Sequence, residues 1–147
     1  MGKNPQTKII QTSHTAELSQ RFGRKTKQLI DSTDYKDVFP ETGLQADSKA
    51  AGRWDTSEGG EYFAAGVGGA ITGRGADLLI IDDPHSEQDA LSDSAMEGAY
   101  EWYTSGPRQR LQPGGAIVLV MTRWSTIDLT GQSVSYTHLR AHETRHD

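Results

Sequence analysis

Two adjacent carboxylates follow an apolar run in the middle of the chain. The run Leu78–Ile81 is purely aliphatic, and Asp82, Asp83 and Pro84 come directly after it. A run that is apolar on both faces predicts a buried strand of a parallel sheet, and Pro84 predicts its end because proline has no N–H for the ladder. A buried strand holds a carboxylate rigidly at the sheet edge, where it can bind Mg²⁺, directly or through water.

The two carboxylates have different expected roles if a nucleotide binds beside them. Asp82 would hold the Mg²⁺ that bridges the β- and γ-phosphates, and Asp83 would orient or deprotonate the attacking water. Most proteins with this pattern have Glu in place of Asp83, and the shorter side chain must reach further. The same residues also fit a strand that simply ends in a turn, because an apolar run followed by two acids is common.

The first half of the chain predicts two strands and a helix that would support this strand. A strand is expected at Lys8–Thr12, and Ser13 or Thr15 is expected to cap the helix that follows it. The apolar stripe of that helix would consist of Leu18, Phe22, Leu29 and Ile30. The polar stretch from residue 31 to residue 60 is expected to be loop with short strands, one of them near residues 53–56. Another strand is expected at Glu61–Val67.

The second half predicts a helix from Ser92 or Asp93 to Thr104, with Pro107 ending it. A second buried strand, Ala116–Met121, follows a Pro-Gly-Gly turn, and a short helix is expected from Thr126 through Leu129. Alternating strands and helices predict an α/β fold with a mostly parallel central sheet. Ligands bind outside the carboxyl ends of such strands, where Asp82–Asp83 and Thr122–Arg123 would both lie.

Composition narrows the class of protein. The 147 residues include 34% hydrophobic residues, 16 glycines and no cysteine, so disulfides and thiolate zinc sites are excluded. The longest apolar runs are too short to span a bilayer, and no leader sequence indicates secretion, so we expect a cytoplasmic protein without a membrane. A net charge of −5 argues against a DNA-coating protein. The densest basic stretch, residues 21–27, is expected to be a solvated helix face.

Several segments together resemble the ATPase domain of phage large terminase subunits. The Gly-rich segment 68–84 carries the resemblance first, with Trp102-Tyr103 and residues 108–111 after it. Residues 113–118 and Thr122-Arg123-Trp124 continue it in the order that the family has. The segment Ile9–Leu29 is similar to the strand and helix that follow the P-loop helix in that family. The resemblance covers residues 4–132 and implies a partial P-loop NTPase fold of the RecA/ASCE-like kind.

The resemblance implies an ATP- and Mg²⁺-dependent motor that drives double-stranded viral DNA into a procapsid. Asp82 would be its magnesium ligand and Asp83 its catalytic carboxylate, and Thr122 would belong to the motif that senses the γ-phosphate. Arg74 lies on the Gly-rich loop and is a candidate arginine finger for a neighbouring subunit; the alternative is a turn residue paired with Asp77. Arg123 is expected to be a structural ion-pair partner.

The implied partners are the portal protein, the small terminase subunit and further copies of the chain in a homo-oligomeric ring. The setting would be the host cytoplasm, and transiently the procapsid portal. No G-x-x-x-x-G-K-[ST] motif occurs in the sequence, and the family's nuclease domain has no counterpart. We therefore expect residues 1–132 to be an incomplete terminase ATPase domain that is inactive by itself.

Residues 133–147 depart from the family and resemble translated adapter sequence from a metagenomic assembly, so we expect a disordered, non-native tail. Its His138, His142 and His146 have the spacing of one helix face, which also suggests zinc. Two other functions remain open for the whole chain. One is a non-catalytic α/β interaction module, and the other is a different P-loop translocase or helicase, although Pro84-His85 replaces the helicase box after the acids. The three tryptophans fit core packing or stacking on DNA bases.

Overall fold

One mixed sheet organises the chain, for which the computed structural model describes residues 1–47, 50–71 and 73–135. Its strands are β1 (Lys8–Ser13), β2 (Arg53–Asp55), β3 (Glu61–Gly66), β4 (Ala76–Asp82) and β5 (Leu111–Val120). They lie in the order β2-β3-β1-β4-β5, and only β2 is antiparallel to its neighbour. This confirms the predicted α/β class with a mostly parallel sheet, and it confirms β4 as an inner strand.

The helices connect the strands as the sequence pattern predicted. They are α1 (Ala16–Ile30), α2 (Thr33–Val38) and α3 (Asp93–Ser105), with 3₁₀ turns η1 (Asp89–Leu91) and η2 (Pro107–Arg110), and residues 129–135 are also helical. The side chain of Thr15 caps α1 by accepting from Leu18, and Ser92 caps α3 by accepting from Ala95. No helix in the described part of the chain is long and apolar enough to cross a membrane.

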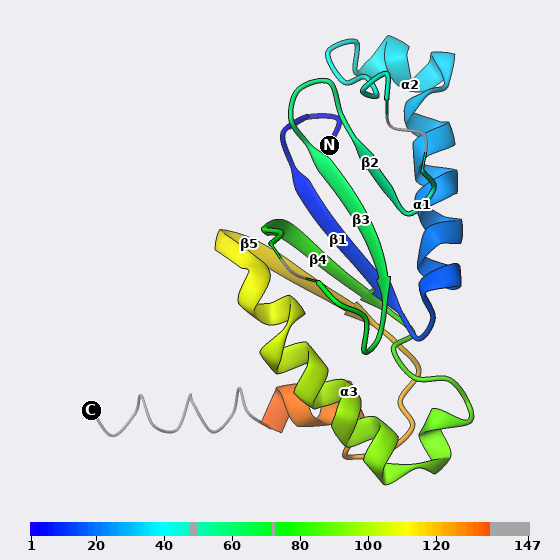
Figure 1. Ribbon diagram of the computed structural model, residues 1–147, viewed down its shortest axis with the longest axis vertical. Helices are drawn as coiled ribbons and strands as arrows, with labels where there is room; N and C mark the ends of the chain where they lie inside the picture. The colour runs from blue at the N-terminus through cyan, green and yellow to red at the C-terminus, as the bar shows by residue number, and fades with distance from the viewer. Residues whose placement is uncertain (48–49, 72, 136–147) are drawn as a thin grey trace.

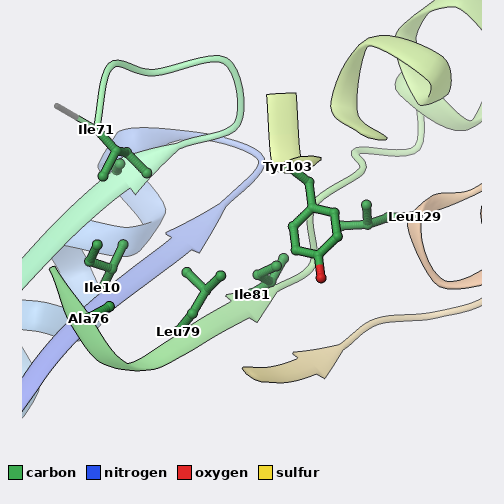
Figure 2. Packing of buried hydrophobic residues seen from close by; sticks show 8 residues of the cluster. Ile10, Ile71, Ala76, Leu79, Ile81, Tyr103 and Leu129 are labelled. Atoms are coloured by element: carbon green, nitrogen blue, oxygen red, sulfur yellow. The ribbon is translucent and has the colours of Figure 1, made fainter. Parts of the chain in front are cut away.

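Each face of the sheet carries one long helix (Figure 1). α1 packs on β1 and β3, where Ile30 of the helix meets the stacked rings of Trp54 and Tyr62. α3 lies over the opposite face, where Tyr103 and Leu129 approach Ile81 (Figure 2). Successive strand residues alternate between these faces. We call them the α1 face and the α3 face.

The α1 face is covered over β1 and β3 but not over β4 and β5. Because Leu79 and Ile81 point into the α3-face core, Leu78 and Ile80 point to the α1 face, where they are only half-buried. Their partners across the ladder on β5 are Ala116 and Val118. This half of the α1 face therefore presents apolar side chains to solvent.

The prediction of a second buried strand was therefore wrong for β5. Within the described residues, β5 pairs with β4 alone and forms an edge of the sheet. Its side chains are exposed on both faces, with Ile117 at 37%, Val118 at 45% and Val120 at 55%. The expected turn at Pro113 lies within the bounds of β5 as an irregularity of the ladder, because Leu111 pairs with Ala76 and Ala116 already with Leu78, and Gly114 has a φ of +79°.

Three local predictions also differ from the structure. Leu29 is 58% exposed, because the inward side of α1 follows Ser19, Gly23 and Ile30 instead. A Cβ on Gly23 would lie 2.7 Å from the ring of Tyr62, so this glycine lets α1 approach the sheet closely. The stretch expected to be loop includes the short helix α2, which Ser32 caps. The last helix begins at residue 129 and not at Thr126.

Candidate functional site

The carboxyl ends of β1, β4 and β5 meet at Asp83. The backbone N–H of Asp83 donates to the carbonyl of Val120, at the end of β5, over 2.9 Å. The backbone N–H of His14, just beyond β1, donates to the carbonyl of Asp83 over 3.0 Å. Asp83 is thus fixed by both neighbouring strands, which confirms that the acidic pair lies at the carboxyl edge of an inner parallel strand.

Asp83 has a strained backbone. Its φ is +46°, and among the described residues it is the one non-glycine residue with a positive φ. A left-handed conformation is unfavourable for an L-residue, although Asp tolerates it better than most. Strain of this kind persists only where the surroundings hold it, and it concentrates at functional sites. The conformation turns the exposed carboxylate of Asp83 away from the direction that a continued strand would give it.

Asp82 is the last residue of β4 and pairs with Val120. Since Ile81 points to the α3 face, Asp82 points to the α1 face, beside the uncovered apolar area. Burial raises the pKa of its carboxyl above the usual value, and the neighbouring charge of Asp83 raises it further. A cation at this position would relieve both effects, since it favours the ionised form.

Ser13 ends β1 next to Asp82, a position that the sequence suggested only as a helix cap. The β1–β4 register pairs Thr12 with Ile81, and continuing it by one residue places Ser13 beside Asp82 on the same face. Ser13 is fully buried, and its Oγ has no hydrogen-bond partner in the described structure. Thr15, and not Ser13, caps α1. No pattern in the sequence indicates this pairing, because the two residues lie on separate strands.

His14 provides a side-chain contact to the same junction. Its Nδ1 lies 3.0 Å from the carbonyl oxygen of Asp83. Because a carbonyl only accepts, Nδ1 must carry the proton, and Nε2 of the neutral ring is left as an acceptor. A surface cleft of about 280 Å³ adjoins this ring and is lined by His14, Thr15, Glu17, Leu18 and Arg21. The carboxyl edge is thus open to ligands beside β1.

Thr122 and Arg123 follow β5, as predicted, but they do different things. Thr122 is exposed, two residues beyond Val120 at the carboxyl edge. Arg123 donates from Nε to both carboxylate oxygens of Asp128, at 3.1 and 3.0 Å, which confirms the structural ion pair. Of these two residues, Thr122 is therefore the one that is available to a ligand at the carboxyl edge of the sheet.

Asp128 organises the loop after β5. It is fully buried and accepts from the backbone N–H groups of Trp124, Ser125 and Gly131. These hydrogen bonds, with that from Arg123, lower the pKa of Asp128 to about 2 although burial alone would raise it. The bond to Gly131 caps the helix at 129–135, which explains why this helix starts later than the sequence pattern predicted.

His85 joins the loop after β4 to the same helix. Its ring is buried, and Nε2 accepts from the backbone N–H of Leu129 over 3.0 Å. Burial lowers the pKa of His85, while the carboxylates of Asp128 and Asp89 oppose that effect. This hydrogen bond connects the segment that follows Asp83 in the sequence to the segment that follows Thr122.

Arg74 lies apart from the two acids. It precedes β4, so the length of a seven-residue strand, about 20 Å, separates its backbone from Asp82. Its guanidinium stacks over the ring of Phe63 at 4.4 Å from the centroid, on the α3 face. The alternative of a pair with Asp77 is not seen, since Asp77 accepts from the backbone N–H of Lys8 and Arg74 is in neither ion pair of the described residues.

The tryptophans pack mainly inside the molecule. Trp54 is 1% exposed and stacks on Tyr62, and Trp102 donates from Nε1 to the carbonyl of Gly69, which anchors the Gly-rich loop on α3. Trp124 is 42% exposed. The helical spacing of His138, His142 and His146, which suggested zinc as an alternative, lies outside the described residues, as does most of the expected tail.

Comparison with known proteins adds no assignment: no family matches the chain, and no curated protein matches it either. The function therefore has to be argued from the geometry of the carboxyl edge. Within the described residues, no three His, Asp or Glu side chains gather as a preformed metal cluster. A cation at Asp82 would need oxygens from water or a ligand in addition, which is how Mg²⁺ binds in phosphate-transfer sites.

Proposed function

We propose that this chain is part of the ATPase domain of a phage terminase large subunit, the part that follows the P-loop. The observation that carries the proposal is the Asp82–Asp83 pair at the carboxyl end of inner strand β4, fixed between the ends of β1 and β5. This is the place where a parallel α/β sheet binds its ligand. Thr122 ends the adjacent strand at the same edge.

The uncovered half of the sheet supports a RecA/ASCE-like P-loop fold. A crossover between two parallel strands is right-handed. Two crossovers that step across the sheet in opposite directions therefore place their helices on opposite faces. The crossover from β1 to β3 steps away from β5, and its helix α1 lies on the α1 face. The crossover from β4 to β5 steps in the opposite direction, and its helix α3 lies on the α3 face. A parallel strand beside β5, connected to β1, would therefore place its helix on the α1 face.

That helix would cover the exposed apolar area, and its N-terminus would lie next to Asp82 and Asp83. It would cover the half-buried Leu78 and Ile80 and the exposed Val118. Following a parallel strand, it would begin at the carboxyl edge, where Asp82 lies. A helix start offers unpaired N–H groups to phosphate, so a triphosphate and a cation held by Asp82 would meet there.

The residues present fit ATP with Mg²⁺. Asp82 is a single carboxylate whose raised pKa reflects burial and Asp83, and beside it lies the unpartnered hydroxyl of Ser13. Both favour a bound cation, which would neutralise charge on the phosphates. Asp83 is exposed and would orient or deprotonate water, and Thr122 would sense the γ-phosphate from the neighbouring strand.

The proposed function also implies the partners of such a motor. These are double-stranded viral DNA, the portal protein, the small terminase subunit and further copies in a ring. In such a ring Arg74 would act as a finger toward the next subunit, and its distance from Asp82 of its own chain suits that role. It would have to leave Phe63, against which it now packs.

A chimera tests the function. The chain would replace the matching segment of an active terminase ATPase domain that supplies its own P-loop. We expect Mg²⁺-dependent phosphate release from the chimera and about a hundredfold loss or more in Asp82→Asn and in Asp83→Asn, because each removes a charge that only the reaction uses. The control is Asp77→Asn, at the other end of β4, which keeps an acceptor for Lys8.

The chain by itself should release little or no phosphate, because its sequence has no P-loop lysine. Robust hydrolysis by the chain alone, lost in Asp82→Ala, would refute the claim that it is an incomplete domain. Full activity of both Asp variants in the chimera would instead remove the site assignment.

A non-catalytic interaction module is the second candidate, and the exposed apolar side chains of β5 favour it. In that case Asp82 and Asp83 only end a strand. The Asp82→Asn and Asp83→Asn substitutions would then leave partner binding unchanged, whereas Val118→Lys would abolish it.

A further inference from the structure

The hydroxyl of Ser13 is a buried polar group without a visible purpose. Ser13 is fully buried, and its Oγ has no hydrogen-bond partner within the described structure. Leaving a buried hydroxyl unpaired costs free energy, so such a group needs an explanation. Two other buried hydroxyls of the described residues are paired: Ser19 donates to the carbonyl of Ala65 at 2.8 Å, and Thr12 donates to that of Ile80.

The surroundings of Ser13 identify its partner. Ile9 packs in the α1-face core and Gln11 accepts from Tyr62, so alternation puts Ser13 on the α1 face. On one side β1 pairs with β4, and continuing their register by one residue beyond Thr12 and Ile81 places Asp82 beside Ser13 on that face. On the other side Ser13 pairs with Gly66, which has no side chain to offer. Asp82 is therefore the polar side chain that the topology brings to this hydroxyl.

We propose that Ser13 is a positioning residue for Asp82, donating its O–H to the carboxylate once a divalent cation is bound. The proposal rests on the proposed function, because it requires Asp82 to be a cation ligand. A ligating carboxylate that is also hydrogen-bonded keeps one orientation, and losing such a support typically weakens metal binding by about 10- to 100-fold. In the cation-free protein the hydroxyl has no partner, so its removal should not weaken the fold.

Manganese titration of the ¹⁵N-labelled chain tests this, with paramagnetic broadening of the amide signals around Asp82 as the readout. We expect broadening of the signals of Asp82, Asp83 and His14 in the wild type and none in Asp82→Asn. Ser13→Ala should need about tenfold more Mn²⁺ for the same broadening. Ser13→Thr, which keeps the hydroxyl, should restore the wild-type response.

Urea unfolding of the same variants separates a positioning role from a structural one. Ser13→Ala should unfold at the wild-type urea concentration or above it. The matched control Ser19→Ala should unfold earlier, because its hydroxyl is paired, yet should bind Mn²⁺ like the wild type.

An unchanged Mn²⁺ response in Ser13→Ala, with Asp82→Asn silent, overturns the role of Ser13 and leaves the proposed function standing. A wild type that shows no broadening near Asp82 overturns both. A Ser13→Ala variant that loses stability as well as Mn²⁺ response, without rescue by Ser13→Thr, assigns the hydroxyl to folding and also overturns the proposal.

Discussion

Asp83 shows how much a single residue depends on its neighbours in space. Its left-handed backbone is held by hydrogen bonds to Val120 and from His14, which come from strands on either side. The junction of these three strands therefore holds a strained backbone of the kind that concentrates at functional sites.

Substitution at Asp83 should separate backbone strain from charge. We expect Asp83→Gly to keep the free energy of unfolding near that of the wild type, because glycine adopts a positive φ freely. Asp83→Ala should lie about 1 kcal/mol below Asp83→Gly, because its Cβ meets the left-handed penalty. Urea unfolding measures both. Equal stabilities of the two variants would show that the positive φ is not maintained in solution.

At the scale of elements, a hydrogen bond connects the loop after β4 to the segment after β5. His85 accepts from Leu129 at the start of the helix at 129–135, and Asp128 caps the same helix while holding Arg123. A change at Asp128 would therefore affect the segment that follows Asp83, because Leu129, the next residue, donates to His85. Coupling of this kind needs no long pathway, since the residues are in direct contact.

The His85 contact predicts a dependence of stability on pH. Burial lowers the pKa of His85 below its ordinary value of 6.5, and the opposing carboxylates are Asp128 and Asp89. Above pH 6.5 the ring is neutral in both states, so its contribution is complete. As the pH falls below 6.5, the unfolded chain takes up the proton first, and stability is lost toward the lowered pKa.

Urea unfolding at pH 7.5 and pH 5.5 measures this loss, with both values chosen to lie about one unit from the ordinary pKa of histidine. We expect the wild type to lose stability at the lower pH and His85→Gln, which keeps an acceptor but cannot titrate, to lose clearly less. Asp128 stays ionised throughout, because its pKa is about 2. An equal loss in both proteins would assign the effect to other groups.

For the whole molecule, the main feature is the uneven cover of its sheet: α1 packs on β1 and β3, whereas the α1 face of β4 and β5 is uncovered. α1 covers one face of β1, and Ile10 on its other face is buried in the core, whereas β5 pairs on one side only within the described residues and exposes apolar side chains. Long apolar edges pair readily with other strands. The same exposure that supports a neighbouring P-loop strand and helix should make the chain by itself associate.

We therefore expect the chain to self-associate as its concentration rises, and Val118→Lys with Val120→Lys to suppress this without lowering the free energy of unfolding by more than about 0.5 kcal/mol. Sedimentation velocity over a concentration series measures the association. The control is Val38→Lys, at a valine that is 68% exposed on helix α2 and is not part of the sheet. Its variant should associate like the wild type, and a monomeric wild type would contradict the prediction.

The sequence alone determined the elements that depend on nearby residues. Leu78–Ile81 with Asp82 predicted an inner strand ending in acids, and the pairs Ser13 or Thr15 and Ser92 or Asp93 predicted where two helices begin, at which the structure has Thr15 and Ser92 as caps. These signals are local, because a strand's alternation and a helix cap involve residues within a few positions. The class of fold followed from their order along the chain.

Only the tertiary structure decided what lies beside what. The contact of His14 with Asp83 joins residues 69 positions apart, and the placement of Ser13 next to Asp82 depends on the register of two strands. The exposure of β5 likewise depends on which neighbours it has, and not on its own apolar residues. Such relations come from pairing and packing between distant segments, so no window of the sequence contains them.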